Sequence, residues 1–212
     1  MLFLSVQCRL ELSPLGCLVQ SLTAGVVWVA VVSATSGFGL ADAVGVDGSA
    51  GGVFVAPLGM SVSDAGFCGL VYARSWPSSV AAVCGADRVL GRVVGRGVDY
   101  WVDQLVRSPV RVVGVKDGRW GFALVTPEPD GLEFSYLFVE PEAFGSGLAA
   151  ALYSSVMGAG RVRPDHAWVL ECNVRSLRFF GSRGWVVDVG AVQPLWADGF
   201  RYVRLLAPPP VV

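Results

Sequence analysis

Apolar residues recur with two different periods along most of this chain. From residue 52 onward, stretches that alternate apolar and polar positions, as strands do, are interleaved with stretches that repeat every three to four residues, as helices do. The pattern predicts strands at 53–57, 111–115, 119–126, 132–139, 167–172, 185–189 and 200–205, and helices at 63–76, 100–106, 148–156 and 174–182. This order of elements is typical of an α+β domain with a mixed, mostly antiparallel sheet.

Short polar segments mark where these elements begin and turn. Lys116-Asp117-Gly118 separates two apolar strands and predicts a tight hairpin. Ser63 is placed to cap the helix at 63–76, because a serine hydroxyl accepts a hydrogen bond from a free N–H of the first helical turn. His166 follows Pro164-Asp165. We expect it in an exposed loop, with a contact to substrate as the alternative.

A glycine-punctuated loop, Phe144-Gly145-Ser146-Gly147-Leu148-Ala149, joins the strand at 132–139 to the helix at 148–156. Such a loop leaves backbone N–H groups unpaired and directed outward at the positive end of the helix dipole. Glycine also allows a ligand to approach the backbone closely. The loop therefore predicts an anion site.

A second motif follows downstream, Asn173-x-x-Ser176-x-x-Phe179-Phe180-x-x-x-Gly184-Trp185. Together the two motifs resemble the GNAT superfamily of acyl-CoA-dependent N-acyltransferases. The signature of that family is a strand, a Q/R-x-x-G-x-G/A loop and a helix, followed by a strand that ends in Asn and a short helix of the form N-x-x-[AS]-x-x-F-[YF]-x-x-x-G-[FW]. The resemblance covers roughly residues 53–207. Two positions depart from it, since Phe144 stands where the family usually has Gln or Arg and Phe180 where it usually has Tyr.

The resemblance implies a central sheet flanked by helices and splayed between its fourth and fifth strands. In the family, the pantetheine arm of CoA lies in that V and hydrogen-bonds exposed backbone like an added strand. The implied cofactor is acetyl-CoA as co-substrate, without a metal. The residues implied to bind it are Val139, Phe144, Gly145, Ser146, Gly147, Leu148, Ala149, Asn173 and Phe180.

The implied activity is transfer of an acetyl group to a primary amine by direct attack. On the resemblance, a backbone N–H near Val139 stabilises the oxyanion. The candidates for the general base are Glu133 on the strand and Glu171 beside Asn173. The two phenylalanines leave an alternative open, a degenerate domain that binds acyl-CoA without catalysis, as a sensor or pseudoenzyme. The acceptor implied is a small-molecule amine or a peptide N-terminus, and a homodimer stays open.

Composition limits the remaining classes of partner. The formal net charge is −1, so no global basic field recruits nucleic acid. The five cysteines contain no C-x-x-C pair and, with a single histidine, offer no convincing metal site. An odd number of unclustered cysteines indicates reduced thiols and a cytoplasmic location.

Residues 1–50 differ from the rest and are read as an N-terminal extension with a Gly/Ser-rich linker, followed by the acyltransferase-like domain at 51–212. Residues 15–34 are largely apolar, with four polar residues interspersed. That length would suffice for a membrane anchor, although the polarity argues against one. A poorly structured extension and a packed accessory element are the alternatives.

Overall fold

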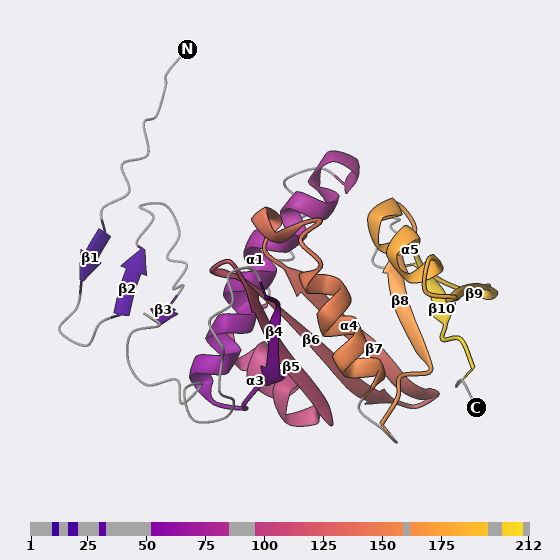
Figure 1. Cartoon of the computed structure of the whole chain (residues 1–212), viewed down its shortest axis with the longest axis horizontal. Coiled ribbons are helices and arrows are strands. Elements are labelled where there is room, and N and C mark those ends of the chain that lie inside the picture. Colours follow the sequence, from indigo (N-terminus) through magenta and orange to yellow (C-terminus); the bar gives the residue numbers. More distant parts are fainter. Residues whose placement is uncertain are drawn as a thin grey trace, which may run out of the picture.

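The chain folds around an open seven-stranded sheet (Figure 1). The computed structural model describes residues 10–12, 17–20, 30–32, 52–84, 96–158, 162–194 and 201–209. The sheet order is β4-β5-β6-β7-β8-β10-β9. The strands are β4 (Phe54–Pro57), β5 (Val110–Lys116), β6 (Arg119–Glu128), β7 (Gly131–Val139), β8 (His166–Leu170), β9 (Val186–Pro194) and β10 (Arg201–Leu206). Its neighbouring strands are antiparallel except for β7 and β8, so the predicted α+β class and mostly antiparallel sheet are confirmed.

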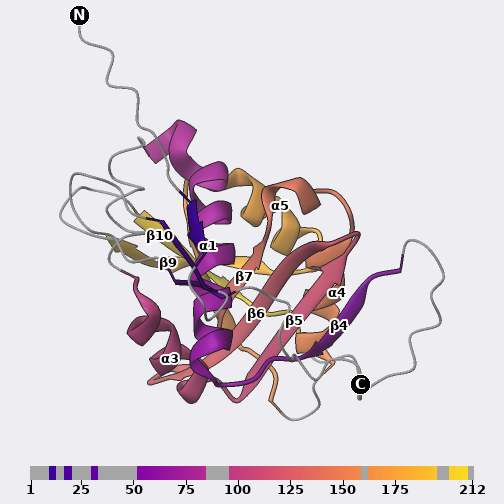
Figure 2. The ribbon, with the colours of Figure 1, turned by 90° about the vertical axis from the view of Figure 1, so that its left-hand side faces the viewer.

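The described helices cover both faces of this sheet (Figure 2). They are α1 (Val62–Cys84), α3 (Val98–Arg107), α4 (Leu148–Met157) and α5 (Val174–Gly181), with a short 3-10 helix η2 (Pro141–Ala143) after β7. Strand side chains alternate between two cores: Val125 and Val112 pack with α4, whereas Phe122 and Leu124 pack with α1 and α3. The alternation follows from the two-residue period of a strand buried on both faces.

Three short strands, β1 (Leu10–Leu12), β2 (Cys17–Gln20) and β3 (Ala30–Val32), pair antiparallel in a separate small sheet. The remainder of 1–51, which holds most of the expected anchor and linker, lies outside the described residues. Across the described part of the chain, no helix is both long enough and apolar enough to cross a membrane.

The sheet is splayed between its fourth and fifth strands, β7 and β8. The two are joined at one register position only, Glu133 opposite His166, and Figure 1 shows β8 standing apart from β7 beyond it. The splay is where the resemblance predicts it. It leaves the facing edges of two strands without their sheet partners, which is how a sheet can accept an added extended ligand.

A β-bulge at Ser135 changes which way β7 presents its side chains. On β6, Leu124 and Val125 are neighbours, yet their partners on β7 are Tyr136 and Phe134. Ser135 is therefore the extra residue of the bulge. The side chains on either side of it, at positions 134 and 136, point to opposite faces of the sheet instead of to the same face. As a result Phe134 packs into the core on the α4 side and Tyr136 into the core on the α1 side.

The structure corrects several predictions from the sequence. The helix predicted to end at residue 76 continues through Pro77 to Cys84. Helix α1 begins at Val62, and its cap is Ser61 rather than Ser63: Asp64 N donates to Ser61 Oγ at 3.1 Å while Ser61 N donates to Asp64 Oδ2 at 2.8 Å. This reciprocal pair is a capping box. His166 is fully buried in β8 instead of exposed in a loop, because strand β8 begins one residue earlier than the apolar run suggests.

The tight hairpin predicted at Lys116-Asp117-Gly118 is present. Asp117 and Gly118 both have positive φ, 50° and 70°, as a two-residue turn between twisted strands requires. The turn brings Lys116 back toward the glycine loop, where its Nζ donates to the carbonyl of Ser146 at 2.6 Å.

Candidate functional site

The end of β7 is held by α1. Ser75 Oγ donates to the carbonyl of Val139 at 2.8 Å. The next residue, Glu140, is buried; its carboxylate accepts from Trp120 N at 3.0 Å and pairs with the guanidinium of Arg74. A buried carboxylate with this set of donors is fixed in position. The strand end and the turn into the glycine loop are therefore rigid.

The glycine loop then opens α4 with a strained backbone. Gly145 and Gly147 have φ of 80° and 91°, in the left-handed region that side chains disfavour. No atom lies within 4 Å of a Cβ built on either of them. Gly147 occupies the N-cap of α4 and has no side chain to cap the helix; the N–H of Leu148, the first helical residue, is bonded instead to the hydroxyl of Ser146.

This loop borders a cavity of about 670 Å³ on the α4 side of the sheet, called here the loop cleft. Seven of the nine residues predicted to bind the cofactor line it: Val139, Phe144, Gly145, Gly147, Ala149, Asn173 and Phe180. The other two, Ser146 and Leu148, do not. The Ser146 hydroxyl accepts from Leu148 N at 3.3 Å, and the Leu148 side chain is fully buried beneath the loop.

Two arginines of the α5 region border the loop cleft. The guanidinium carbon of Arg175 lies 4.0 Å from the centre of the Phe144 ring. Arg183 lies 3.6 Å from the centre of the Phe179 ring and donates to the carbonyl of Phe179 at 2.8 Å. Arg178 is exposed and does not line the cleft. Arg175 and Arg183 therefore lie at the cleft, whereas Arg178 of α5 lies away from it.

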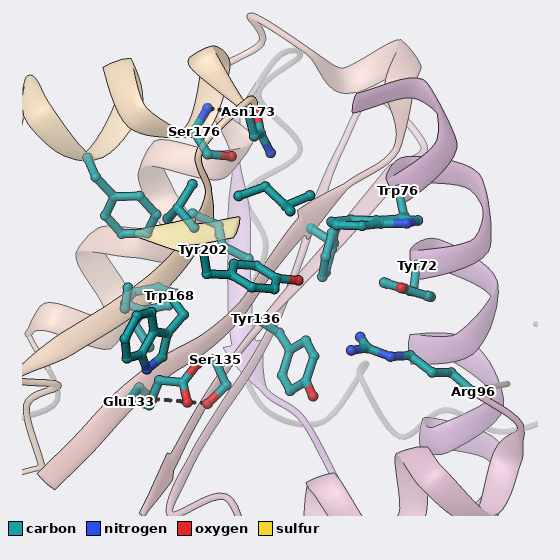
Figure 3. Close-up of a pocket in the computed structure, with 17 residues that line it drawn as sticks. Tyr72, Trp76, Arg96, Glu133, Ser135, Tyr136, Trp168, Asn173, Ser176 and Tyr202 are labelled. Carbon is teal, nitrogen blue, oxygen red and sulfur yellow. Dashed lines mark hydrogen bonds between the residues drawn. The ribbon is translucent and has the colours of Figure 1, made fainter. Parts of the chain in front are cut away.

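Asn173 ends the turn after β8 and caps α5. Its Oδ1 accepts from Ser176 N at 3.1 Å. This bond fixes the side-chain amide, whose Nδ2 points toward the cavity in Figure 3. A donor is therefore presented where the two clefts of the site meet.

A second cavity of about 300 Å³, called here the aromatic cleft, opens on the other side of the gap between β7 and β8. It shares five residues with the loop cleft: Leu137, Phe138, Asn173, Ser176 and Phe180. Its walls are largely aromatic, and Figure 3 shows Tyr72 and Trp76 of α1 facing Trp168 and Tyr202 of the far strands. The charged residues that line it are Arg96 and Glu133.

Glu133 has an unusual environment for a carboxylate. Its pKa is raised from 4.5 to about 7, mainly by burial and then by the negative charges of Glu128 and Asp130, against the opposing effect of Arg107 and Arg204. Desolvation disfavours the charged form of an acid, so this carboxylate holds its proton up to neutral pH. A group that titrates near 7 is suited to accept a proton in a reaction at that pH.

The other base candidate, Glu171, is exposed and lines neither cleft. Its backbone N–H donates to the carbonyl of Arg201 at 2.9 Å, which places it at the outer edge of the β8–β10 pair. The structure thus brings Glu133 to the site and leaves Glu171 outside it.

Several lining residues were not singled out from the sequence. Arg96, Tyr72 and Trp76 come from segments distant in the chain from β7. Tyr72 and Trp76 are four residues apart, a spacing that puts them on one helix face, but an aromatic pair at that spacing most often belongs to a core. Tyr136 also lines the aromatic cleft. Its hydroxyl is hydrogen-bonded to that of Tyr100 and donates to Gln104 Oε1 at 3.3 Å. Burial raises the pKa of this phenol.

Comparison with solved structures identifies the fold. PaiA N-acetyltransferase from Thermoplasma acidophilum, in complex with coenzyme A, is similar over 73% of this chain and 99% of its own, with a TM-score of 0.55 and 14% identity. A GCN5-related N-acetyltransferase from Rhodopseudomonas palustris is similar over 75% of this chain and 96% of its own, with a TM-score of 0.58 and 16% identity. The ribosomal-protein-S18-alanine N-acetyltransferase from Escherichia coli is similar over 74% of this chain and 94% of its own, with a TM-score of 0.50 and 15% identity. No protein-family model and no curated protein sequence matches the chain. The chain has the GNAT fold, as the two motifs predicted.

Proposed function

We propose that residues 51–212 form an acyl-CoA-dependent N-acyltransferase domain that moves an acetyl group from acetyl-CoA to a primary amine. The observation that carries the proposal is the meeting of the loop cleft and the aromatic cleft at the gap between β7 and β8. A thioester bound from one side of the sheet and an amine bound from the other then meet in the gap. The shared fold with a coenzyme A complex supports the cofactor.

In this proposal the cofactor lies along the loop cleft. Backbone N–H groups at Gly145, Gly147 and Ala149 hold the pyrophosphate at the N-terminus of α4. Arg175, stacked on Phe144, supplies the cation that the family usually carries at position 144. The pantetheine arm pairs with the edge of β7 up to Val139, and Asn173 donates to it from the other lip.

The chemical step is a direct transfer. The amine nitrogen attacks the thioester carbonyl carbon, so an N–C bond forms and the C–S bond breaks. The proton of the amine passes to the carboxylate of Glu133, directly or through water. A backbone N–H of β7 near Val139 stabilises the oxyanion. Coenzyme A leaves as a thiolate that takes its proton from water, because Phe180 has none to give.

The acceptor in the proposal is a small-molecule amine or a peptide N-terminus, and the reaction takes place in the cytoplasm. We expect the segments 77–98 and 190–199, the latter with Trp196, to select the acceptor; the structure describes only parts of these segments, and Trp196 lies outside the described residues.

The test begins with cofactor binding. Acetyl-CoA at about 100 times its dissociation constant should stabilise the full chain by about 2.7 kcal/mol, measured by thermal unfolding. Gly147→Glu places a carboxylate in the open space beside the loop and should abolish this shift. Gly118→Glu is the matched control, since Gly118 also has positive φ and open space around its Cβ but lines neither cleft.

Turnover is measured next, as free thiol released from acetyl-CoA with a panel of amines. Release that depends on the amine supports transfer. Binding without release by any amine would instead support the degenerate domain, which the phenylalanines at 144 and 180 favour. An unchanged thermal shift in Gly147→Glu would remove the loop from the cofactor site. A chain shortened to begin at Gly51 should retain both activities if the domain boundary is correct.

A further inference from the structure

Arg96 stands out in the aromatic cleft. Its guanidinium carbon lies 4.9 Å from the ring centres of Tyr72 and Tyr100, and 5.8 Å from that of Tyr136. The guanidinium is therefore within cation–π distance of all three rings, and its N–H donors lie around its own edge. Figure 3 shows the group directed from the α1 side toward the interior of the cleft.

No carboxylate within the described residues forms an ion pair with Arg96. A half-buried guanidinium is costly when its donors are unmatched, and a carboxylate matches its fork geometry with two parallel hydrogen bonds. A second cation would instead be repelled, because Arg96 already occupies the ring faces that could attract it. The chemistry of this corner thus favours an anionic group on the ligand.

The opposite end of the cleft has the opposite character. Glu133 lies on the far side of Tyr136 from Arg96 in Figure 3, beside Trp168. A carboxylate at this end can take up a proton that water relays from an amine in the cleft. Between the two ends, the lining is mainly aromatic and includes Trp76, Phe138 and Tyr202. Such walls suit an apolar or aromatic body.

We propose that the acceptor is an amino carboxylate with an apolar or aromatic side chain, of which a free aromatic α-amino acid is the simplest case. Its carboxylate pairs with Arg96, its side chain lies among the rings, and its amine, borne by the same carbon as the carboxylate, faces the interior of the cleft, from which its proton reaches Glu133 through water. The inference rests on the proposed function for the identity of the reacting group, but the ligand chemistry it names is tested by binding alone.

The experiment compares phenylalanine with phenethylamine and phenylalaninamide, which keep the ring and the amine and lack the carboxylate. Each is titrated calorimetrically into the full chain saturated with CoA, and thiol release from acetyl-CoA is measured in parallel. Phenylalanine should bind at least about ten-fold more tightly than either analogue, as expected for a charge-assisted bidentate pair. Its kcat/KM should exceed theirs by a similar factor.

Substitutions assign the preference to one side chain. Arg96→Gln should remove the difference between phenylalanine and phenethylamine, and Arg96→Lys, which keeps the charge without the fork, should retain part of it. Arg178→Gln, on an exposed position outside both clefts, should leave the preference unchanged. Thermal unfolding of each variant separates a lost contact from a lost fold.

The outcomes are distinct. Equal binding of the three ligands, tighter binding of the two analogues that lack the carboxylate, no binding at all, or a preference that survives in Arg96→Gln overturns the inference. A preference for phenylalanine in binding without thiol release from any amine overturns the transferase proposal and leaves the ligand assignment standing.

Discussion

The guanidinium carbon of Arg175 lies over the ring of Phe144 at the rim of the loop cleft, 4.0 Å from the ring centre. Phe144 has no charge to offer a phosphate. The face of the ring nevertheless attracts a cation from another element, at the position where the residue itself supplies no charge. The replacement at 144 is thus accompanied by a cation that reaches the same rim from α5.

Arg175→Gln should weaken CoA binding about five-fold, the effect of about 1 kcal/mol expected for one exposed charge-assisted contact. The measurement is calorimetric titration with CoA and with pantetheine, which lacks the nucleotide phosphates and should bind both proteins equally. Arg178→Gln is the control on the same helix. A loss of the same size for pantetheine would mean that Arg175 acts through the fold and not on a phosphate.

Asn173 should show two separable roles. Asn173→Asp keeps the oxygen that accepts from Ser176 N, so thermal stability without ligand should be retained, while the loss of the Nδ2 donor and the added charge should weaken CoA binding. Asn173→Ala should lose both, with about 1 kcal/mol of stability removed with the helix cap. Equal CoA affinity for wild type and Asn173→Asp would show that the residue serves only as a cap.

The pH dependence of transfer should report Glu133. Because burial raises its pKa to about 7, the fraction of deprotonated base rises through neutral pH, and kcat/KM should rise with it to a plateau. Glu133→Gln should remove the inflection near pH 7 and lower kcat by about 10²- to 10⁴-fold. Should Glu171→Gln be the variant that removes the inflection, the base is Glu171 and the proton path leaves the aromatic cleft.

The same raised pKa predicts a stability effect with a definite sign. Between pH 4.5 and about 7 the folded protein holds a proton on Glu133 that the unfolded chain releases, so the contribution of this group to stability falls as pH rises through that window. Relative to wild type, Glu133→Gln should therefore gain up to about 3 kcal/mol in unfolding free energy on going from pH 4.5 to pH 8. Urea denaturation of both proteins at the two pH values measures it. A difference that does not change with pH would contradict the raised pKa.

Local sequence signals predicted the elements and the glycine loop before α4 well. The hairpin at Asp117-Gly118 and the two glycines at 145 and 147 need positive φ, a property of the residue type that is visible in the sequence. The order of strand-like and helix-like periods along the chain predicted the α+β class in the same way, because each period is visible within a short stretch of sequence. Helix α1 shows the limit, since its capping box at Ser61 and Asp64 lies two residues before the predicted cap, where the apolar pattern is silent.

Side chains whose role depends on distant partners were not predictable in the same way. His166 was expected in solvent and is fully buried, because the strand that carries it meets β7 at that residue. Glu133 could have been an ordinary surface carboxylate. Its raised pKa comes from burial in a cleft whose other walls are supplied by α1, β8 and β10.

The sequence by itself determined the α+β order, the hairpin at Asp117-Gly118 and the glycine loop before α4, since each follows from residues within a few positions of one another. Only the tertiary structure decided which carboxylate and which arginines face the site. The bulge at Ser135 turns Tyr136 toward α1, and the single pairing of Glu133 with His166 leaves β7 and β8 apart beyond it. Strand register and the faces it sets depend on contacts between segments far apart in the chain, and a local pattern carries no information about them.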